Sequence, residues 1–254
     1  MKITILTLFP EFFTSFVNTS IIKRAIEKKV VEVECVNYRD FSTDKLKRVD
    51  YPPYGGGAGM IISLKPILDC LKVVRTKESK VYLLSAKGVV FKQEIAHQMA
   101  KINHLILICG HYEGVDERIL NYIDGEICIG DYILTGGEIG AMAIADSIIR
   151  LLDGTISKES TADESFEKHN LLEYPQYAFP RDYNGDVVPD VLFSGNHQAI
   201  DNFRFKESIK KTLKNRPELL DISKFSKKEK KIYDALEDDT LEKEAIQKAH
   251  KFMK

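Results

Sequence analysis

The chain has no tryptophan and only four cysteines among its 254 residues. These cysteines, at positions 35, 70, 109 and 128, contain no CxxC pair, so neither a zinc site nor a disulfide framework is predicted. Cys109 and Cys128 end short apolar runs, where cysteine behaves as a small hydrophobic side chain. We therefore expect these two thiols to be packing residues.

Long hydrophobic runs and excess charge are also missing. No apolar stretch approaches the roughly 20 residues that a membrane-spanning helix needs. The opening residues MKITILTLFPEFF are interrupted too early for a signal peptide. We therefore expect a cytoplasmic protein with no membrane association. The net charge is −1, so any nucleic-acid surface must be a local patch rather than a property of the whole chain.

The chain does have the apolar content and the alternating pattern of an α/β protein. Hydrophobic residues make up 44% of it, enough for one large domain or two smaller ones. Residues 2–8 and 30–36 read as strands on either side of a stretch with helical spacing. Further strands are expected at residues 81–84, 105–109 and 126–129, and further helices at residues 66–74 and 92–101. This alternation predicts an α/β fold with a mostly parallel sheet.

Two of the expected strands stop at a glycine and are followed by reactive side chains. Residues 110–118 read GHYEGVDER and residues 130–138 read GDYILTGGE. Open α/β sheets bind ligands just beyond the carboxyl ends of their strands, so these loops are expected to form opposite walls of one pocket. The alternative is two ordinary strand-to-helix turns in which glycine serves only a positive φ. Finding both loops together favours the pocket.

A third glycine-rich stretch, residues 50–60, reads DYPPYGGGAGM. Four glycines in five residues predict a mobile loop that lets a ligand touch the backbone. A dinucleotide fingerprint would need its glycines directly between a strand and a helix, whereas here two prolines precede them. A plain flexible connector is the remaining alternative.

Residues 138–152 form an expected helix that is apolar nearly all round. Such a helix is buried on most faces, within the core or against a second subunit. Arg150 lies near its end. An arginine buried without a partner is costly, so Arg150 is either exposed or holds an anion or a developing negative charge.

Composition changes sharply after this helix. Residues 153–170 are polar, as in a linker, and we place a domain boundary there. Residues 203–234 then carry 11 Lys/Arg against 5 Asp/Glu. This basic stretch, with Phe203 and Phe205 among its charges, is typical of a surface for a phosphate backbone, although a solvated helix face is the simpler alternative. Residues 241–254 are expected to form a last, structural helix.

Taken together, CGHYEGVDER, IGDYILTGGE and YGGGAGM resemble the signature of the bacterial tRNA (guanine-N1)-methyltransferases. This family belongs to the knotted (SPOUT) class of S-adenosylmethionine-dependent RNA methyltransferases and modifies position 37, beside the anticodon. The resemblance extends from residue 9 to residue 217. It implies an α/β fold whose mostly parallel sheet contains a deep trefoil knot, followed by a small helical C-terminal domain. The implied domains are residues 1–156 for the cofactor, a linker at 157–172, and residues 173–254 for tRNA.

The resemblance also assigns residues to ligands. It implies that S-adenosylmethionine contacts Leu83, Leu84, Ser85, Gly110, Tyr112, Glu113, Gly114, Ile129, Gly130, Asp131, Tyr132, Ile133, Leu134, Gly136 and Gly137. It implies that tRNA contacts Asp50, Gly55, Gly56, Gly57, Gly59, Ser194, Asn196, His197 and Arg204. It further implies a homodimer whose active site is shared between subunits. No fixed metal site is implied, and Mg²⁺ assists through the RNA or the carboxylates.

Methylating guanine N1 requires removal of its proton, and a carboxylate suits that role. The family's base is an aspartate in a DSF triplet. Here the residues are Asp163-Glu164-Ser165-Phe166, which places Glu164 at the family position. The spacing from Phe166 to Leu171 is one residue longer than usual, so Asp163 stays an equal candidate. Arg150 matches the catalytic arginine, which would stabilise negative charge on guanine O6.

The chain departs from the family pattern at three places: Tyr51 replaces an acid, His111 stands where arginine is frequent, and Gly140 replaces a proline. Three other functions remain open. A knotted methyltransferase for another RNA position would transfer methyl groups elsewhere, and a non-catalytic RNA-binding module would transfer none. A Rossmann oxidoreductase would bind NAD, for which the sequence lacks a proper fingerprint.

Overall fold

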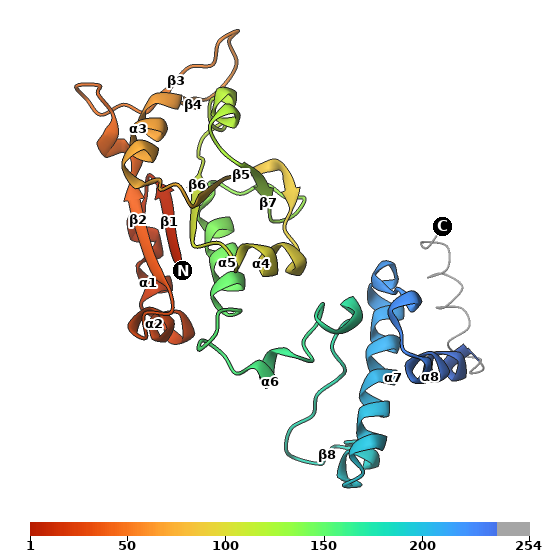
Figure 1. Cartoon of the computed structure of the whole chain (residues 1–254). Coiled ribbons are helices and arrows are strands. Elements are labelled where there is room, and N and C mark those ends of the chain that lie inside the picture. Colours follow the sequence, from red (N-terminus) through yellow and green to blue (C-terminus); the bar gives the residue numbers. More distant parts are fainter. Residues whose placement is uncertain (238–254) are drawn as a thin grey trace. The chain divides into compact units, whose positions relative to one another are not determined.

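The computed structural model describes residues 1–237, which divide into two compact units (Figure 1). Unit 1 is Met1–Ser157, and unit 2 begins at Lys158. The last predicted helix, over residues 241–254, lies outside the described residues. Within residues 1–237, no helix is both long and apolar enough to cross a membrane.

Unit 1 is built on a five-stranded sheet in which every strand pair is parallel, as the sequence predicts. The strand order is β2-β1-β6-β5-β7. The bounds are β1 Lys2–Thr7, β2 Glu32–Asn37, β5 Ser79–Val90, β6 His104–Cys109 and β7 Gly125–Cys128. Every residue of the central strand β6 is buried, because helices cover both faces of the sheet. The prediction of a buried apolar strand at residues 105–109 was therefore correct.

Strand alternation divides the apolar side chains of unit 1 between two cores. Ile3 and Ile5 of β1 pack on one face with helices α2 (Ser20–Glu27), α4 (Gln93–Met99) and α5 (Glu138–Ile149). Leu6 packs on the other face with η2 (Tyr38–Phe41), α3 (Leu64–Val74) and η3 (Glu117–Asn121). The short elements η1 (Pro10–Phe13) and α1 (Thr14–Val17) connect β1 to α2. The result is a three-layer α/β/α arrangement that leaves the strand ends open for a site (Figure 1).

Two elements of unit 1 differ in detail from the prediction. Helix α3 begins at Leu64, so Pro66 is its third residue rather than its first. Proline is tolerated there because N–H groups in the first helical turn have no partner within the helix. In α5 a stripe of Ile139, Ala143 and Asp146 is exposed, while the remaining faces are buried or half-buried as predicted.

The glycine-rich stretch of residues 50–60 is the turn of a small hairpin. Strand β3 (Asp50–Tyr51) pairs antiparallel with β4 (Ile61–Ile62). Backbone hydrogen bonds fix this hairpin to the loop after β6: the Glu113 amide donates to the Met60 carbonyl at 3.0 Å, and the Ile62 amide donates to the Gly114 carbonyl at 2.9 Å. The sequence did not predict this pairing, which places the glycines beside the reactive loop.

Unit 2 is small and mainly helical. Its elements are α6 (Lys158–Thr161), η4 (Lys168–Asn170), β8 (Asp182–Tyr183), β9 (Asp186–Val187), η5 (Asp190–Phe193), α7 (His197–Asn215), η6 (Pro217–Leu219), η7 (Ile222–Lys224) and α8 (Lys227–Glu237). Its core joins Leu171, Ile209 and Leu213 with Tyr233 and Leu236. Phe205 also belongs to this core, with ring centroids 5.3 Å from Phe225. The expectation that Phe205 lies among the surface charges is therefore wrong, because its ring is buried in the core of unit 2.

Candidate active site

A pocket in unit 1 lies at the carboxyl edge of three neighbouring strands. It has a volume of about 380 Å³ and is formed by the loops after β6 and β7 together with the middle of β5. These strands are adjacent in the order β6-β5-β7, so their carboxyl ends open onto the same place. The two loops that the sequence singled out, residues 110–114 and 129–137, both line it. This is the geometry in which open parallel sheets bind ligands.

A bulge in β5 supplies the third wall. The pairing of β5 with β7 is interrupted between Leu84 and Val89, so residues 85–88 leave the regular ladder. Gly88 lets β5 rejoin its ladder with β7, because a Cβ at this position would overlap the backbone of Glu126 and Ile127. Ser85 is held by its own turn, its hydroxyl accepting the Lys87 amide at 3.1 Å.

Nearly all of the predicted cofactor residues meet at this pocket. Its lining includes Leu83, Leu84, Ser85, Gly110, Tyr112, Glu113, Gly114, Ile129, Gly130, Tyr132, Ile133, Leu134, Gly136 and Gly137. Asp131 is exposed and is not part of the lining. Cys128 and Gly140 also line the pocket although the sequence did not predict them there, and so does His111, which lies in a predicted pocket loop but was not assigned to the cofactor. Their positions directly beside the glycine loops were the signal that could have found them.

The two loops are joined where they leave the sheet. His111 and Gly136 form an antiparallel bridge, and the Gly137 amide donates to the Gly110 carbonyl at 2.9 Å. Gly137 has no room for a side chain, since a Cβ there would lie 2.7 Å from the Cα of Cys109. The glycine pair therefore allows the loop after β7 to pass directly against the end of β6.

A buried carboxylate lies under this junction. Glu138, the first residue of α5, is 3% exposed. Its Oε1 accepts the Thr7 hydroxyl at 2.7 Å, and its Oε2 lies 2.8 Å from His111 Nε2. The Thr7 oxygen in turn accepts the Phe9 amide at 2.9 Å. Glu138 thus connects β1, the loop after β6 and the start of α5.

Neighbouring acidic groups stay protonated around Glu138. Burial raises the pKa of the Tyr38 phenol far above its ordinary value, and nearby Cys109 and Glu138 raise it further. Burial likewise raises the pKa of the Cys109 thiol well above its ordinary value, with Glu138 adding to the effect. Tyr38 donates its hydroxyl to the Cys109 carbonyl at 3.3 Å. The Tyr38 phenol and the Cys109 thiol therefore stay neutral at the end of β6.

The residues predicted to contact tRNA lie on both units. In unit 1, Asp50 begins the β3–β4 hairpin, and the exposed glycines Gly55, Gly56, Gly57 and Gly59 all have positive φ. A Cβ at Gly59 would lie 2.5 Å from Cγ of Glu113, so this loop directly borders the pocket. In unit 2, Asn196 is the N-cap of α7 and accepts the Ala199 amide at 3.1 Å, while Ser194 and His197 flank it.

Arg204 lies in unit 2 and projects from α7. Its guanidinium stacks over the Tyr174 ring, 4.9 Å from the ring centroid. Its Nε is buried and has no hydrogen-bond partner among the described residues. A buried donor without an acceptor is costly, so an acceptor from a ligand would relieve this site.

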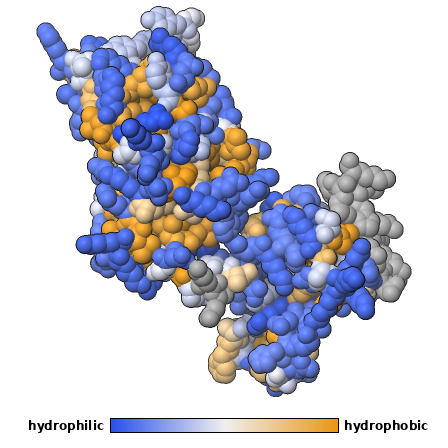
Figure 2. All heavy atoms as spheres, viewed as in Figure 1, coloured by the Kyte–Doolittle hydropathy of each residue, from blue (hydrophilic) through white to orange (hydrophobic). Residues whose placement is uncertain are grey.

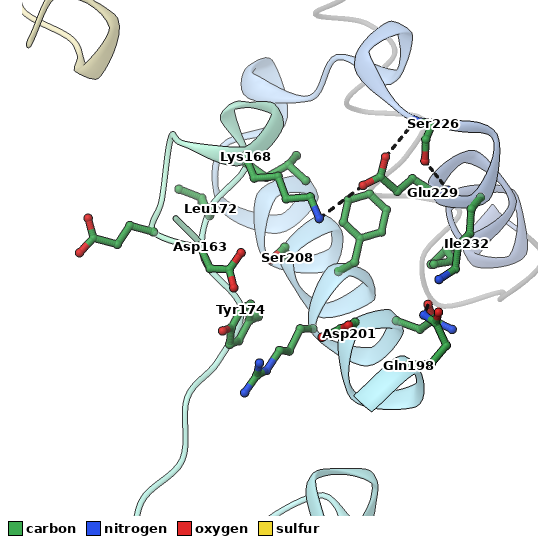
Figure 3. Close-up of a pocket in the computed structure, with 16 residues that line it drawn as sticks. Asp163, Lys168, Leu172, Tyr174, Gln198, Asp201, Ser208, Ser226, Glu229 and Ile232 are labelled. Atoms are coloured by element: carbon green, nitrogen blue, oxygen red, sulfur yellow. Dashed lines mark hydrogen bonds and ion pairs between the residues drawn. The ribbon is translucent and has the colours of Figure 1, made fainter. Parts of the chain in front are cut away.

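The two candidate catalytic acids belong to a second pocket, inside unit 2. It measures about 290 Å³, and its lining includes Asp163, Glu164, Tyr174 and Arg204. Figure 3 shows the Asp163 carboxylate directed toward Tyr174 on the same side of the pocket. Burial raises the pKa of the Tyr174 phenol. Arg204 opposes this effect, and the charge of Asp163 adds to it. Ionisable groups dominate this pocket, unlike the glycine-lined one in unit 1.

The segment that carries these acids is folded rather than extended. The Phe166 amide donates to the Leu171 carbonyl at 2.8 Å, and the Leu172 amide donates to the Thr212 hydroxyl at 2.9 Å. Leu171 is buried in the unit 2 core. Although its composition is that of a linker, this segment is attached to α7, so Asp163 and Glu164 move with unit 2.

His169 anchors the same segment to α8. It lies 3.2 Å from Glu229, and its ring packs against Phe225 at 5.4 Å. Glu229 also accepts the Ser226 amide at 2.9 Å. Burial opposes ionisation of Glu229, yet hydrogen bonds from Ser226 and His169 lower its pKa to about 2. The side of the pocket formed by α8 therefore carries the ionised carboxylate of Glu229.

Arg150 lies at the end of α5 opposite to the pocket of unit 1. Gly137 and Gly140, at the start of the helix, line that pocket, while Arg150 follows its last residue, Ile149. A helix of 12 residues is about 18 Å long. Arg150 is half-buried and is not among the residues that line the pocket.

Comparisons with known proteins identify the family of the chain. The family model described as "tRNA (Guanine-1)-methyltransferase TrmD" matches residues 1–222. A tRNA (guanine-N(1)-)-methyltransferase of Malacoplasma penetrans is 56% identical over 219 residues, 86% of this chain and 96% of the relative. Proteins with the same name from Aster yellows witches'-broom phytoplasma and Halalkalibacterium halodurans are 50% and 47% identical, covering 91% and 93% of this chain and 96% and 98% of the relatives. Family membership implies S-adenosylmethionine as methyl donor and tRNA as substrate. The chain belongs to the bacterial tRNA (guanine-1)-methyltransferase family, and it methylates guanine N1 in tRNA.

Proposed function

We propose that the methylated guanine is at position 37 of tRNA, beside the anticodon, and that the enzyme works as a homodimer of knotted subunits with shared active sites. The observation that carries this proposal is the pocket at the carboxyl edge of β5, β6 and β7, which collects the loops of the family signature. In this proposal residues 1–156 bind the cofactor, residues 157–172 connect the domains, and residues 173–254 bind tRNA.

The pocket of unit 1 suits S-adenosylmethionine. Its volume of about 380 Å³ lies within the roughly 300–1,000 Å³ of small-molecule sites. Glycines at 110, 114, 130, 136 and 137 let a ligand approach the backbone, and Leu83, Ile129 and Leu134 supply apolar contact. When bound there, the cofactor would supply the sulfonium methyl group that guanine N1 receives. Within residues 1–237 no group of three or more His, Cys, Asp or Glu is arranged to hold a metal ion. We propose that Mg²⁺ acts through the RNA or the carboxylates.

The reaction needs a base and a stabilising charge. In our proposal Glu164 or Asp163 accepts the N1 proton of guanine. Arg150 stabilises the negative charge that builds on guanine O6 as the proton leaves. The target base must be splayed out of the RNA loop to be reached. The basic face of α7, with Arg204, would hold the phosphate backbone near it.

A second copy of the chain accounts for the position of Arg150. About 15 Å of helix separates it from Gly140, which lines the pocket of its own unit, so we infer that it serves the site of a partner. The exposed stripe of α5 contains Ile139 and Ala143, and Ile133 and Val89 are also exposed in unit 1. Figure 2 shows apolar residues of unit 1 reaching the surface between polar ones. Apolar surface of this kind is typical of an interface between subunits.

The test is methyl transfer from labelled S-adenosylmethionine to a tRNA transcript with guanine at position 37. A matched transcript carries adenine at that position. We expect label in the first transcript only. Label in both would move the target base elsewhere, and transfer to neither, with tRNA still bound, would leave an RNA-binding module.

A further inference from the structure

We infer that Arg204 recognises the target guanine directly, and that its guanidinium donates a hydrogen bond to guanine N7 in the pocket of unit 2. This inference rests on the proposed function, because the candidate bases Asp163 and Glu164 line the same pocket. It refines the tRNA contact proposed for Arg204 by assigning that contact to the base rather than to a phosphate. Arg204 is then a specificity-determining residue for guanine methylation.

The Arg204 guanidinium is held in place while one of its donors is unused. Its Cζ lies 4.9 Å from the centroid of the Tyr174 ring, in cation–π contact. Its Nε is buried and has no hydrogen-bond partner among the described residues. A guanidinium has only donors, and a buried donor without an acceptor is costly. The ligand that completes this site must therefore bring an acceptor to Arg204.

The carboxylates of the pocket fall into two groups. Glu229 is already engaged, because it pairs with Lys168 at 3.5 Å (Figure 3) and lies 3.2 Å from His169. Asp163 and Asp201 also line the pocket and are exposed. A carboxylate accepts hydrogen bonds and donates none when ionised. The pocket therefore offers a ligand a donor at Arg204 and acceptors at the carboxylates.

The charge of the pocket favours a base over a phosphate. Its lining contains four carboxylates against three cations. Like charges repel, so a phosphate bound at Arg204 would also face the carboxylates of Asp163, Glu164 and Asp201. A neutral base that carries both donors and acceptors suits both kinds of group. The volume of about 290 Å³, at the lower end of small-molecule sites, suits a single base.

Guanine has the matching pattern of donors and acceptors. Its N7 and O6 are acceptors on one edge, while N1 and the 2-amino group carry protons on the opposite side. A bond from Arg204 to N7 leaves O6 for the proposed contact with Arg150. Adenine also has N7, but its N1 carries no proton for a carboxylate to accept. The pocket therefore recognises guanine from both sides, with Leu172 and Ile232 as apolar lining for its faces.

The experiment changes one atom of the substrate. A tRNA with 7-deazaguanine at position 37 has a C–H group in place of N7 and keeps O6, N1 and the 2-amino group. Methyl transfer from labelled S-adenosylmethionine gives kcat/KM for this tRNA and for the guanine tRNA. We compare the wild type with Arg204→Lys, which keeps the charge but lacks the planar guanidinium. Lys211→Gln, which changes an exposed cation on the same helix, is the control.

We expect the wild type to use the 7-deazaguanine tRNA about 10- to 100-fold less efficiently, the range of one hydrogen bond to a charged group. Arg204→Lys should lose a similar factor with the guanine tRNA and little more with the analogue, because the variant and the analogue remove the same contact. Lys211→Gln should affect both tRNAs equally. Thermal unfolding of each variant reports whether the fold is retained.

Equal use of the two tRNAs by the wild type would overturn the inference, and this comparison needs no variant to fold. An Arg204→Lys variant that lowers kcat/KM by the same factor for both tRNAs would also overturn it, since a phosphate contact predicts that result. Methyl transfer that persists when position 37 is adenine would instead contradict the proposed function, because the label then lies on another base.

Discussion

The two pockets of this protein differ in what they are made of. The pocket of unit 1 is lined mainly by glycines and apolar side chains, and its charged residues are Lys87, Glu113, Glu117 and Glu126. The pocket of unit 2 is lined by Asp163, Glu164, Asp201 and Glu229 together with Lys168, Lys228 and Arg204. Shape and backbone contacts suit holding a cofactor, whereas ionisable groups suit moving a proton and gripping RNA. We infer that binding and proton chemistry are divided between the units, so that variants in each should fail in different ways.

The largest effect should come from the candidate base. Of Asp163→Asn and Glu164→Gln, one should lower kcat by about 10²- to 10⁴-fold while S-adenosylmethionine binds as before, because only the proton acceptor is lost. Glu167→Gln is the nearby acidic control. Single-turnover methyl transfer with calorimetry on the same samples measures both quantities. If both amides retained full activity, the division of labour proposed here would be wrong.

The second-largest effect is expected for Arg150→Ala. This variant should lower kcat by about 10²- to 10³-fold, because the charge that stabilises guanine O6 is lost. Cofactor affinity should be unchanged, since in our proposal Arg150 acts on guanine O6 rather than on the cofactor. A mixed dimer sharpens this test. Coexpressed Arg150→Ala and Glu164→Gln chains would regain activity when base and arginine come from different chains, because one site then has both intact. Continued inactivity would place both residues in one chain.

Destabilising unit 2 alone tests whether the units are independent. Ile209 is fully buried in the unit 2 core, so Ile209→Ala should cost about 2–5 kcal/mol of that unit's stability. Unit 1 has its own two cores and should still bind S-adenosylmethionine. Denaturant unfolding followed by a probe in each unit would show two separated transitions. A single transition that also abolished cofactor binding would mean that the units fold as one.

A smaller change should appear in unit 1 with Gly137→Ala. The added methyl would lie 2.7 Å from the Cα of Cys109, and such overpacking costs about 1–3 kcal/mol. If this cost falls on cofactor binding, affinity for S-adenosylmethionine should fall by about 5- to 150-fold, while kcat at saturating cofactor changes little. Gly185→Ala, in the β8–β9 turn of unit 2, is the control for glycine substitution. Equal effects of the two variants on cofactor affinity would argue against close packing at Gly137.

The smallest effect concerns the end of the sheet away from the pocket. Buried His104 starts β6 and lies 2.9 Å from the Thr4 hydroxyl and 2.8 Å from the Ser79 hydroxyl. Burial and, secondarily, Lys2 lower the pKa of His104. The folded state therefore binds its proton less readily than the unfolded chain, so stability should decline as pH falls below about 6.5. Urea unfolding between about pH 7.5 and pH 5.5 should show a slope that His104→Asn reduces. An unchanged slope would rule His104 out as its source.

The sequence alone determined the parallel sheet and the identity of the pocket loops. Apolar runs that end in glycine, such as LILICG, have one stable solution, a buried strand followed by a tight turn. The sequence motifs GHYEGVDER and GDYILTGGE then indicated the family, which the relatives confirm.

Other features were decided only by tertiary structure, because they depend on groups far apart in the chain. The contact between His111 and Glu138 spans 27 residues, and the Thr7 hydroxyl that completes it comes from another strand. Phe205 lies in a run of charges, yet long-range packing against Phe225 buries it. The polar segment around Asp163 and Glu164 has no local reason to fold and is fixed by Leu171 and Thr212. Sequence patterns record local preference, whereas burial of these groups depends on which distant surfaces meet.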